Sequence, residues 1–193
     1  LFKIAKNNTE HSTVANFFKE GKNDLAALCR STFDEDRKFS GTEQPVVGIT
    51  WYAAQAYCFW LSLCAGKPDS YCLPNDIQRE WAAGGKREPI PQKVREYSWA
   101  DEKGEPTPTL ANFGMNIGHT TPVNRYPEGA TPEGLYDMGG NVWEWCNDSV
   151  GSRRVIRGGG WSRNAGFCRS SYRYGFTPGY RSNFVGFRPV FVP

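Results

Sequence analysis

The sequence predicts a single globular domain of the α+β class, and three observations support this prediction. Its 193 residues suit one domain with a sizeable core. The first half holds two segments that carry the capping residues of helices. After Gly84 the chain is rich in Gly, Pro, Asn and aromatic residues, and its candidate strands are no longer than about four to six residues.

The first predicted helix follows a short predicted strand at 45–51. Thr50 stands at the position of an N-cap, apolar residues then recur with helical spacing, and Gly66 follows as a terminator. The second helix begins near Asn75. Gln78 lies three residues after this cap, which predicts a capping box.

The second half depends on large side chains to fill its core. The clearest strands are 155–157 and 186–191, and the seven Trp of the chain fit a domain whose core is built on irregular backbone. No apolar run approaches the roughly 18 to 20 residues of a membrane span, so no transmembrane segment is expected.

The net charge of +3 hides an asymmetry. Eight Arg and no acid or Lys follow Asp148, which leaves the first 148 residues with a net charge of −5.

Of the six Cys, none forms a CxxC pair, which argues against a zinc ribbon or a thioredoxin-like site. The two His argue against a histidine-based metal or acid–base site.

Several ordered motifs resemble the formylglycine-generating enzyme (sulfatase-modifying factor) family. They lie at 45–58, 73–83, 111–113, 134–145, 157–161 and 186–188. The resemblance implies a C-type-lectin-like fold of the formylglycine-generating enzyme type, with two helices around a small twisted β-core and long loops. It makes residues 41–193 the domain and residues 1–40 an N-terminal extension packed on it.

The resemblance also implies metal chemistry that this chain matches only in part. Oxidases of the family bind copper through two Cys five residues apart; here the second position is Cys168 and the first is Arg163. One thiolate cannot provide two-sulfur coordination of Cu(I). A related branch holds iron with three His, and this chain has two. We therefore expect no cofactor, no catalytic residue and no enzymatic activity.

A calcium site is the other metal that the resemblance implies. Its ligands would be Asp137, the carbonyls of Gly140 and Val142, and Glu144, and such oxygen ligands suit Ca²⁺. A second family site begins at Asn112 but lacks its acidic ligand here. The alternative, which we favour, is that the two carboxylates cap loops or pair with Arg.

Residues 161–185 carry the strongest functional signal from composition. Seven of these 25 residues are aromatic, against 15% of the chain, and most others are Ser, Gly, Asn or Arg. Antibody paratopes use the same residue types. Because apolar and polar residues do not alternate here, we expect loops presenting a surface rather than a strand. The alternative is that the aromatic residues form core.

A second resemblance concerns the C-terminal motifs at 157–161, 168–170 and 185–190. They resemble the variable region of diversity-generating retroelement proteins, which include phage tail-tip receptor-binding proteins and treponemal variable proteins. In that family, adenine-directed mutagenesis of AAC codons reaches Asn, Ser, Tyr, Arg, Gly and Phe, but never Lys, Glu, Gln, Trp or Met. Lys, Glu, Gln and Met are absent from 161–185.

This resemblance implies a variable ligand-binding region at about 155–190. The ligand-binding candidates are Ser162, Arg163, Gly166, Phe167, Tyr172, Tyr174, Gly175, Phe176, Gly179, Tyr180, Ser182, Asn183 and Phe184. The fixed framework would be Trp161, Cys168, Arg169, Arg173, Pro178 and Arg181.

We therefore expect a non-enzymatic display protein whose diversified C-terminal surface binds a variable partner, an unknown protein or surface ligand. The alternative is a divergent formylglycine-generating oxidase acting on cysteine-containing peptides. Arg and Tyr in the tail could contact nucleic acid, but the acidic body and the lack of Lys there oppose it, so no nucleic acid is expected. The resemblance also implies display at the cell surface or outside the cytoplasm, with a lipid anchor on a removed N-terminal segment as one means.

Overall fold

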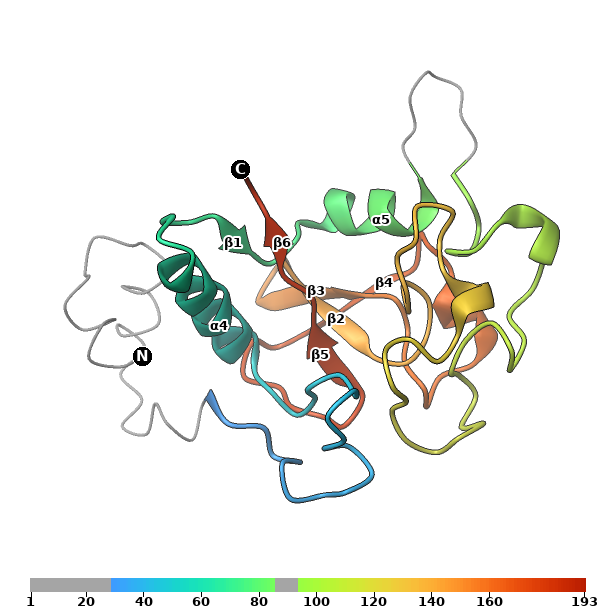
Figure 1. Cartoon of the computed structure of the whole chain (residues 1–193), viewed down its shortest axis with the longest axis horizontal. Coiled ribbons are helices and arrows are strands. Elements are labelled where there is room, and N and C mark those ends of the chain that lie inside the picture. Colours follow the sequence, from blue (N-terminus) through green and yellow to red (C-terminus); the bar gives the residue numbers. More distant parts are fainter. Residues whose placement is uncertain (1–28, 86–93) are drawn as a thin grey trace.

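The computed structural model describes residues 29–85 and 94–193, and these form an α+β fold in which two helices flank a small curled sheet (Figure 1). In this view, helix α4 (Trp51–Cys64) lies to the left of the sheet, and α5 (Asp76–Gly84) runs above it. Long loops gather at the end of the sheet remote from α4.

Both helices begin at the residues that the sequence predicts. The Thr50 hydroxyl accepts a hydrogen bond of 3.0 Å from the Ala53 amide at the start of α4. Asn75 and Gln78 form the predicted capping box of α5, with hydrogen bonds of 2.7 and 2.8 Å. These bonds satisfy amide groups that a helix leaves unpaired at its N-terminus. After α4, Gly66 adopts a φ of 63°, which favours glycine.

The main sheet has four strands in the order β4-β3-β2-β5. Their bounds are β2 (Trp143–Val150), β3 (Arg153–Arg157), β4 (Arg173–Phe176) and β5 (Val185–Phe187). β3 is antiparallel to β2 and β4, whereas β5 is parallel to β2. β1 (Tyr71–Cys72) and β6 (Val190–Phe191) form a separate antiparallel pair. The β2–β3 register shifts between Trp145 and Ser149, and such irregularities increase strand twist.

The main core lies between α4 and the sheet, and three of the ten buried residues in this cluster are Trp. Trp51 and Trp145 are buried there with Ile156. The Trp51 indole donates to the Cys146 carbonyl at 3.0 Å, and the Trp145 indole donates to the Ile49 carbonyl at 3.3 Å. A buried indole needs such a partner, so these bonds fix irregular segments to the sheet.

Three strand predictions are wrong. Residues 45–50 form no strand, because Gly48 has a φ of 67° and its amide bonds to the Ser182 carbonyl instead of a sheet ladder. The predicted strand at 186–191 divides into β5 and β6, which belong to different sheets and are separated by Arg188 and Pro189. β2 has eight residues, more than the expected four to six.

Residues 1–28 of the expected N-terminal extension lie outside the described residues. Within the described part of that extension, Phe33 and Phe39 pack with Val47, Val142 and Trp161 in a second cluster. The boundary near residue 40 stays a prediction. No helix within 29–85 and 94–193 is long and apolar enough to cross a membrane.

Candidate functional site

Six aromatic side chains from the 3₁₀ turn Ala165–Cys168, β4 and their flanking loops form two groups of contacting rings. We call the two groups together the aromatic surface, which consists of Phe167, Tyr172, Tyr174, Phe176, Tyr180 and Phe184. Phe176 and Tyr180 stack with ring centroids 4.0 Å apart, and Phe184 lies 6.5 and 6.4 Å from them. Phe167 and Tyr172 pack at 4.7 Å and both contact Trp143.

None of the thirteen ligand-binding candidates is buried. Arg163, Tyr174 and Gly179 are exposed, and the other ten are half-buried. Within the described chain, no hydrogen bond involves the hydroxyls of Tyr172, Tyr174 or Tyr180. A phenolic hydroxyl that remains free in water can bond to a partner.

The proposed framework residues instead bond to the body of the domain. The guanidinium of Arg169 pairs with Glu96 at 3.0 Å, and Arg173 pairs with Asp76 at 2.8 Å. Arg181 donates to the Gly48 carbonyl at 3.3 Å. Cys168 is buried. The Pro178 carbonyl accepts a hydrogen bond from the Trp51 amide, and the Trp161 indole donates one to the Asn183 carbonyl.

The loop that carries the last candidates is therefore held by its backbone. The Trp143 amide donates to the Phe184 carbonyl at 2.8 Å, and the Gly48 amide donates to the Ser182 carbonyl at 2.9 Å. Because these bonds use main-chain atoms, side chains at 182–184 can change without removing them. A fixed backbone with replaceable side chains is a suitable platform for recognition.

Two expectations about this segment need correction. Residues 173–176 form β4, a strand at the edge of the sheet, so the segment is not made of loops alone. Side chains two apart in a strand share a face, and accordingly Tyr174 and Phe176 contact each other at 5.3 Å. Second, most rings are neither free surface nor core: all but Tyr174 pack against the main core while remaining partly exposed.

A buried network of ion pairs surrounds Glu144 of β2, and the composition of the sequence did not predict it. The Glu144 carboxylate accepts from Arg79 Nε at 2.7 Å and from Arg188 Nη2 at 3.0 Å. Burial raises the pKa of Glu144, but the charges of Arg188 and Arg79 outweigh burial and hold that pKa below its ordinary value. One feature of the sequence could have indicated this network. No acid follows Asp148, so any ion pair of the C-terminal Arg must be made with an acid in the first 148 residues.

These contacts decide the calcium question at Glu144. Both of its oxygens are engaged by guanidinium groups, so they do not fit a calcium site. Burial raises the pKa of Asp137 to about 7, and its carboxyl accepts from Asn141 at 3.0 Å. At the second expected site, Asn112 Oδ1 is buried without a hydrogen-bond partner in the described chain, but one neutral oxygen is too few for Ca²⁺.

The copper and iron arrangements of the family do not fit either. Burial raises the pKa of Cys168 to about 12, which keeps it a thiol, and Arg163 at the other copper position is exposed. His11 lies outside the described residues. Within 29–85 and 94–193 no group of three or more His, Cys, Asp and Glu could hold a metal ion.

The fold and this surface define a C-type-lectin-like domain of the formylglycine-generating enzyme type. Residues 2–192 match the model of the sulfatase-modifying factor enzyme 1-like domain, and the chain belongs to this family. The solved structure of Treponema denticola variable protein 1 is similar, with a TM-score of 0.63 and 25% identity, over 84% of this chain and 77% of that one. The resemblances to the family and to its variable proteins are thereby confirmed.

Curated relatives extend the comparison. The hercynine oxygenase of Mycolicibacterium thermoresistibile is 32% identical over 170 residues, which cover 76% of this chain and 35% of the relative. The formylglycine-generating enzyme of Streptomyces coelicolor is 32% identical over 177 residues, 75% of this chain and 51% of the relative. The chain thus spans about a third to a half of these relatives.

The expectation that the chain has no enzymatic character is overturned by these relatives. Proteins named as enzymes match it at 32% identity over three quarters of its length. Missing copper and iron ligands were too narrow a basis for that expectation, because they exclude two arrangements of a site rather than membership of an enzyme family.

Proposed function

We propose that this domain binds a protein ligand through the aromatic surface and that its contact residues are diversified by a retroelement. The observation that carries the proposal is the separation of two residue sets. None of the thirteen candidates is buried, while the framework residues Arg169, Arg173 and Arg181 bond to the body of the domain. A diversified site requires this separation, because its side chains must change without unfolding the protein.

The chemistry of the surface suits a protein ligand. Tyr and Phe offer large contact areas with few rotatable bonds, and Arg adds planar charged groups. Arg163 extends the surface, with its guanidinium 5.5 Å from the Phe184 ring. The likeness to a protein named as a variable protein supports the same assignment. Display at the cell surface or outside the cytoplasm is part of this proposal.

Sequencing of the gene and its flanking DNA from sibling isolates tests the diversification. We expect substitutions confined to the thirteen candidates, a near-copy of the variable region nearby, and a reverse transcriptase gene. Substitutions spread evenly over exposed residues of the whole domain, with no such cassette, would remove the retroelement from the proposal.

Selection of random peptides from a display library on the immobilised protein tests binding. The double variant Arg163→Ser, Tyr174→Ser changes two exposed candidates and should lose most selected ligands. Its control, Tyr57→Ser with Arg125→Ser, changes exposed residues outside the aromatic surface and should retain them. Equal loss in both variants, or no enrichment at all, would contradict ligand binding by this surface.

Catalysis is the second candidate function, favoured by the identity to enzymes. The assay is incubation with a cysteine-containing sulfatase peptide and copper, followed by hydrazide labelling of any aldehyde. An aldehyde that forms with the wild type and disappears with Cys168→Ser would support this candidate. No aldehyde above the protein-free control would remove formylglycine generation as the reaction.

A further inference from the structure

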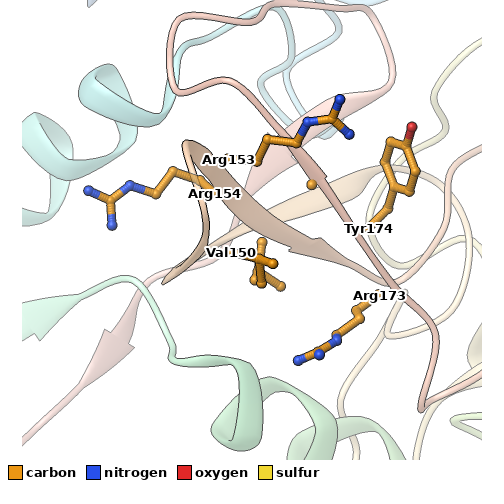
Figure 2. Close-up of a pocket in the computed structure, with 7 residues that line it drawn as sticks. Val150, Arg153, Arg154, Arg173 and Tyr174 are labelled. Atoms are coloured by element: carbon orange, nitrogen blue, oxygen red, sulfur yellow. The ribbon is translucent and has the colours of Figure 1, made fainter.

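A hollow of about 210 Å³ lies beside the aromatic surface, where the β2–β3 turn meets β4. We call it the arginine hollow, and its lining residues are Val150, Arg153, Arg154, Val155, Arg173, Tyr174 and Gly175. Figure 2 shows Arg153 extending to the side of Tyr174, whereas Arg154 extends away from it. Three of the seven lining residues are cationic and none is acidic, so the hollow favours an anion.

The three guanidinium groups differ in what they already bind. Arg173 pairs with Asp76, and Arg154 lies 3.8 Å from the centre of the Trp51 ring and donates to the Asn147 carbonyl. Arg153 is exposed, and within the described chain it has no ion pair, hydrogen bond or ring contact. Arg153 is thus the group with its full hydrogen-bonding capacity available, and a guanidinium binds a carboxylate with two parallel hydrogen bonds.

The shape of the hollow depends on Gly175, a ligand-binding candidate. A Cβ at this position would lie 3.2 Å from Arg153 Cβ and 3.2 Å from the Arg154 carbonyl oxygen. Both are closer than most Cβ contacts, so a larger residue would crowd the floor of the hollow. Arg153 and Arg154 are not among the ligand-binding candidates, whereas Tyr174 and Gly175 are. Under the proposed diversification, these two cations therefore stay constant while part of the lining of the hollow varies.

β4 supplies a backbone beside these charges. Among the strands of residues 29–85 and 94–193, it lies at the edge of the sheet and pairs with β3 alone. The free edge of such a strand can hydrogen-bond to an added extended segment, whose alternate side chains then point to one face. Val150 and Tyr174, exposed by 60% and 47%, add apolar contact area on the lining.

We propose that the arginine hollow binds a carboxylate of the protein partner, presented on an acidic extended segment that pairs with β4. This rests on the proposed function and adds the charge and conformation of the ligand. An acidic protein segment fits better than nucleic acid, because only a polypeptide backbone can add a strand to the edge of β4.

Fluorescence anisotropy with labelled octapeptides tests the proposal. The probes alternate Val with Glu, Gln or Lys. We expect the Glu peptide to bind at least tenfold more tightly than the Gln peptide, and the Lys peptide not to bind. Arg153→Ala and Gly175→Ser should each weaken the Glu peptide at least fivefold, whereas Arg125→Ala, an exposed Arg outside the hollow, should not. Hydrogen exchange at 173–176 should slow with the Glu peptide.

Equal binding of the Glu and Gln peptides, or an unchanged affinity in Arg153→Ala, would overturn the proposal. Tighter binding of single-stranded oligothymidine through the same residues would overturn it in favour of nucleic acid. The peptide-library selection described above distinguishes failure of the acidic-anchor proposal from failure of ligand binding by the aromatic surface. Enriched peptides without an excess of Asp and Glu would leave ligand binding standing and remove the acidic anchor alone.

Discussion

The indole Nε1 of Trp161 donates a hydrogen bond of 3.0 Å to the main-chain carbonyl of Asn183. A framework side chain thereby holds the backbone of a ligand-binding candidate and leaves that candidate's own side chain unconstrained. This bond joins the glycine-rich segment before Trp161 to the loop before β5. The main-chain atoms of this loop therefore contribute to stability, while its side chains are available for the proposed ligand binding.

Removal of that indole should be costly. We expect Trp161→Ala to lower the free energy of unfolding by about 3–5 kcal/mol, because Trp161 is buried against Phe39 and the loop bond is lost as well. Trp81→Ala is the matched control: Trp81 is 43% exposed on α5, and we expect a change below about 1 kcal/mol. Urea denaturation measures both, and equal effects would refute the scaffold role of Trp161.

Glu144 should be indispensable to the fold. Glu144→Gln leaves Arg79 and Arg188 without their shared countercharge, and Arg79 is only 2% exposed, so we expect a loss of about 3–5 kcal/mol. The control is Glu133→Gln, whose carboxylate is 55% exposed in its pair with Arg95 and should cost less than about 1 kcal/mol. Similar melting temperatures for both variants would contradict this prediction.

Asp137 should make stability depend on pH. Burial raises its pKa from 3.8 to about 7, so the folded state favours the neutral acid. Its contribution to stability is full below about pH 4 and is lost as pH rises through about 7. Asp137→Asn keeps a neutral side chain, and relative to wild type it should gain up to about 4 kcal/mol between pH 4 and 8. A constant difference across that range, measured by urea denaturation, would show that Asp137 is not buried as a neutral acid.

The aromatic surface should show a gradient of structural importance. Tyr174→Ala should change stability by less than about 0.5 kcal/mol, because Tyr174 is 47% exposed and lies outside the rings packed on the core. Phe184→Ala should cost about 1–2 kcal/mol, because its ring is partly buried against the core and contacts Phe176 and Tyr180. Thermal denaturation of both variants is the measurement, and a larger loss from Tyr174→Ala would contradict this packing.

Five of the six Cys should react with alkylating reagents in two distinct groups. All six are free thiols, and Cys29 and Cys64 are exposed. Burial raises the pKa values of Cys58, Cys146 and Cys168 to about 12, so at pH 8 they are both inaccessible and un-ionised. Iodoacetamide on the folded protein should modify the exposed pair and spare the buried three, as read by peptide mass spectrometry. Rapid labelling of Cys168 in the folded protein would contradict this arrangement.

Local signals gave the correct helices, and nonlocal contacts explain the wrong strands. The caps at Thr50 and Asn75 depend on residues within three positions, so the sequence predicts them well. Within residues 45–50, the Gly48 amide donates to the carbonyl of Ser182, more than 130 positions away, and no local pattern predicts such a bond. The eight-residue β2 contains charged and polar residues that look unsuitable for a central strand until Arg79 and Arg188 are placed beside Glu144.

The sequence by itself determined the family, both helix starts and the residue types offered to a ligand, because each is written in adjacent residues or in composition. Only the tertiary structure decided how those residues are used. It packed most aromatic rings halfway into the core, made 173–176 an edge strand, and left Arg153 without an ion pair in the described chain while Arg157 and Arg173 share Asp76. The physical reason is that exposure and ion pairing depend on distances between residues far apart in the chain, which spacing along the sequence does not encode.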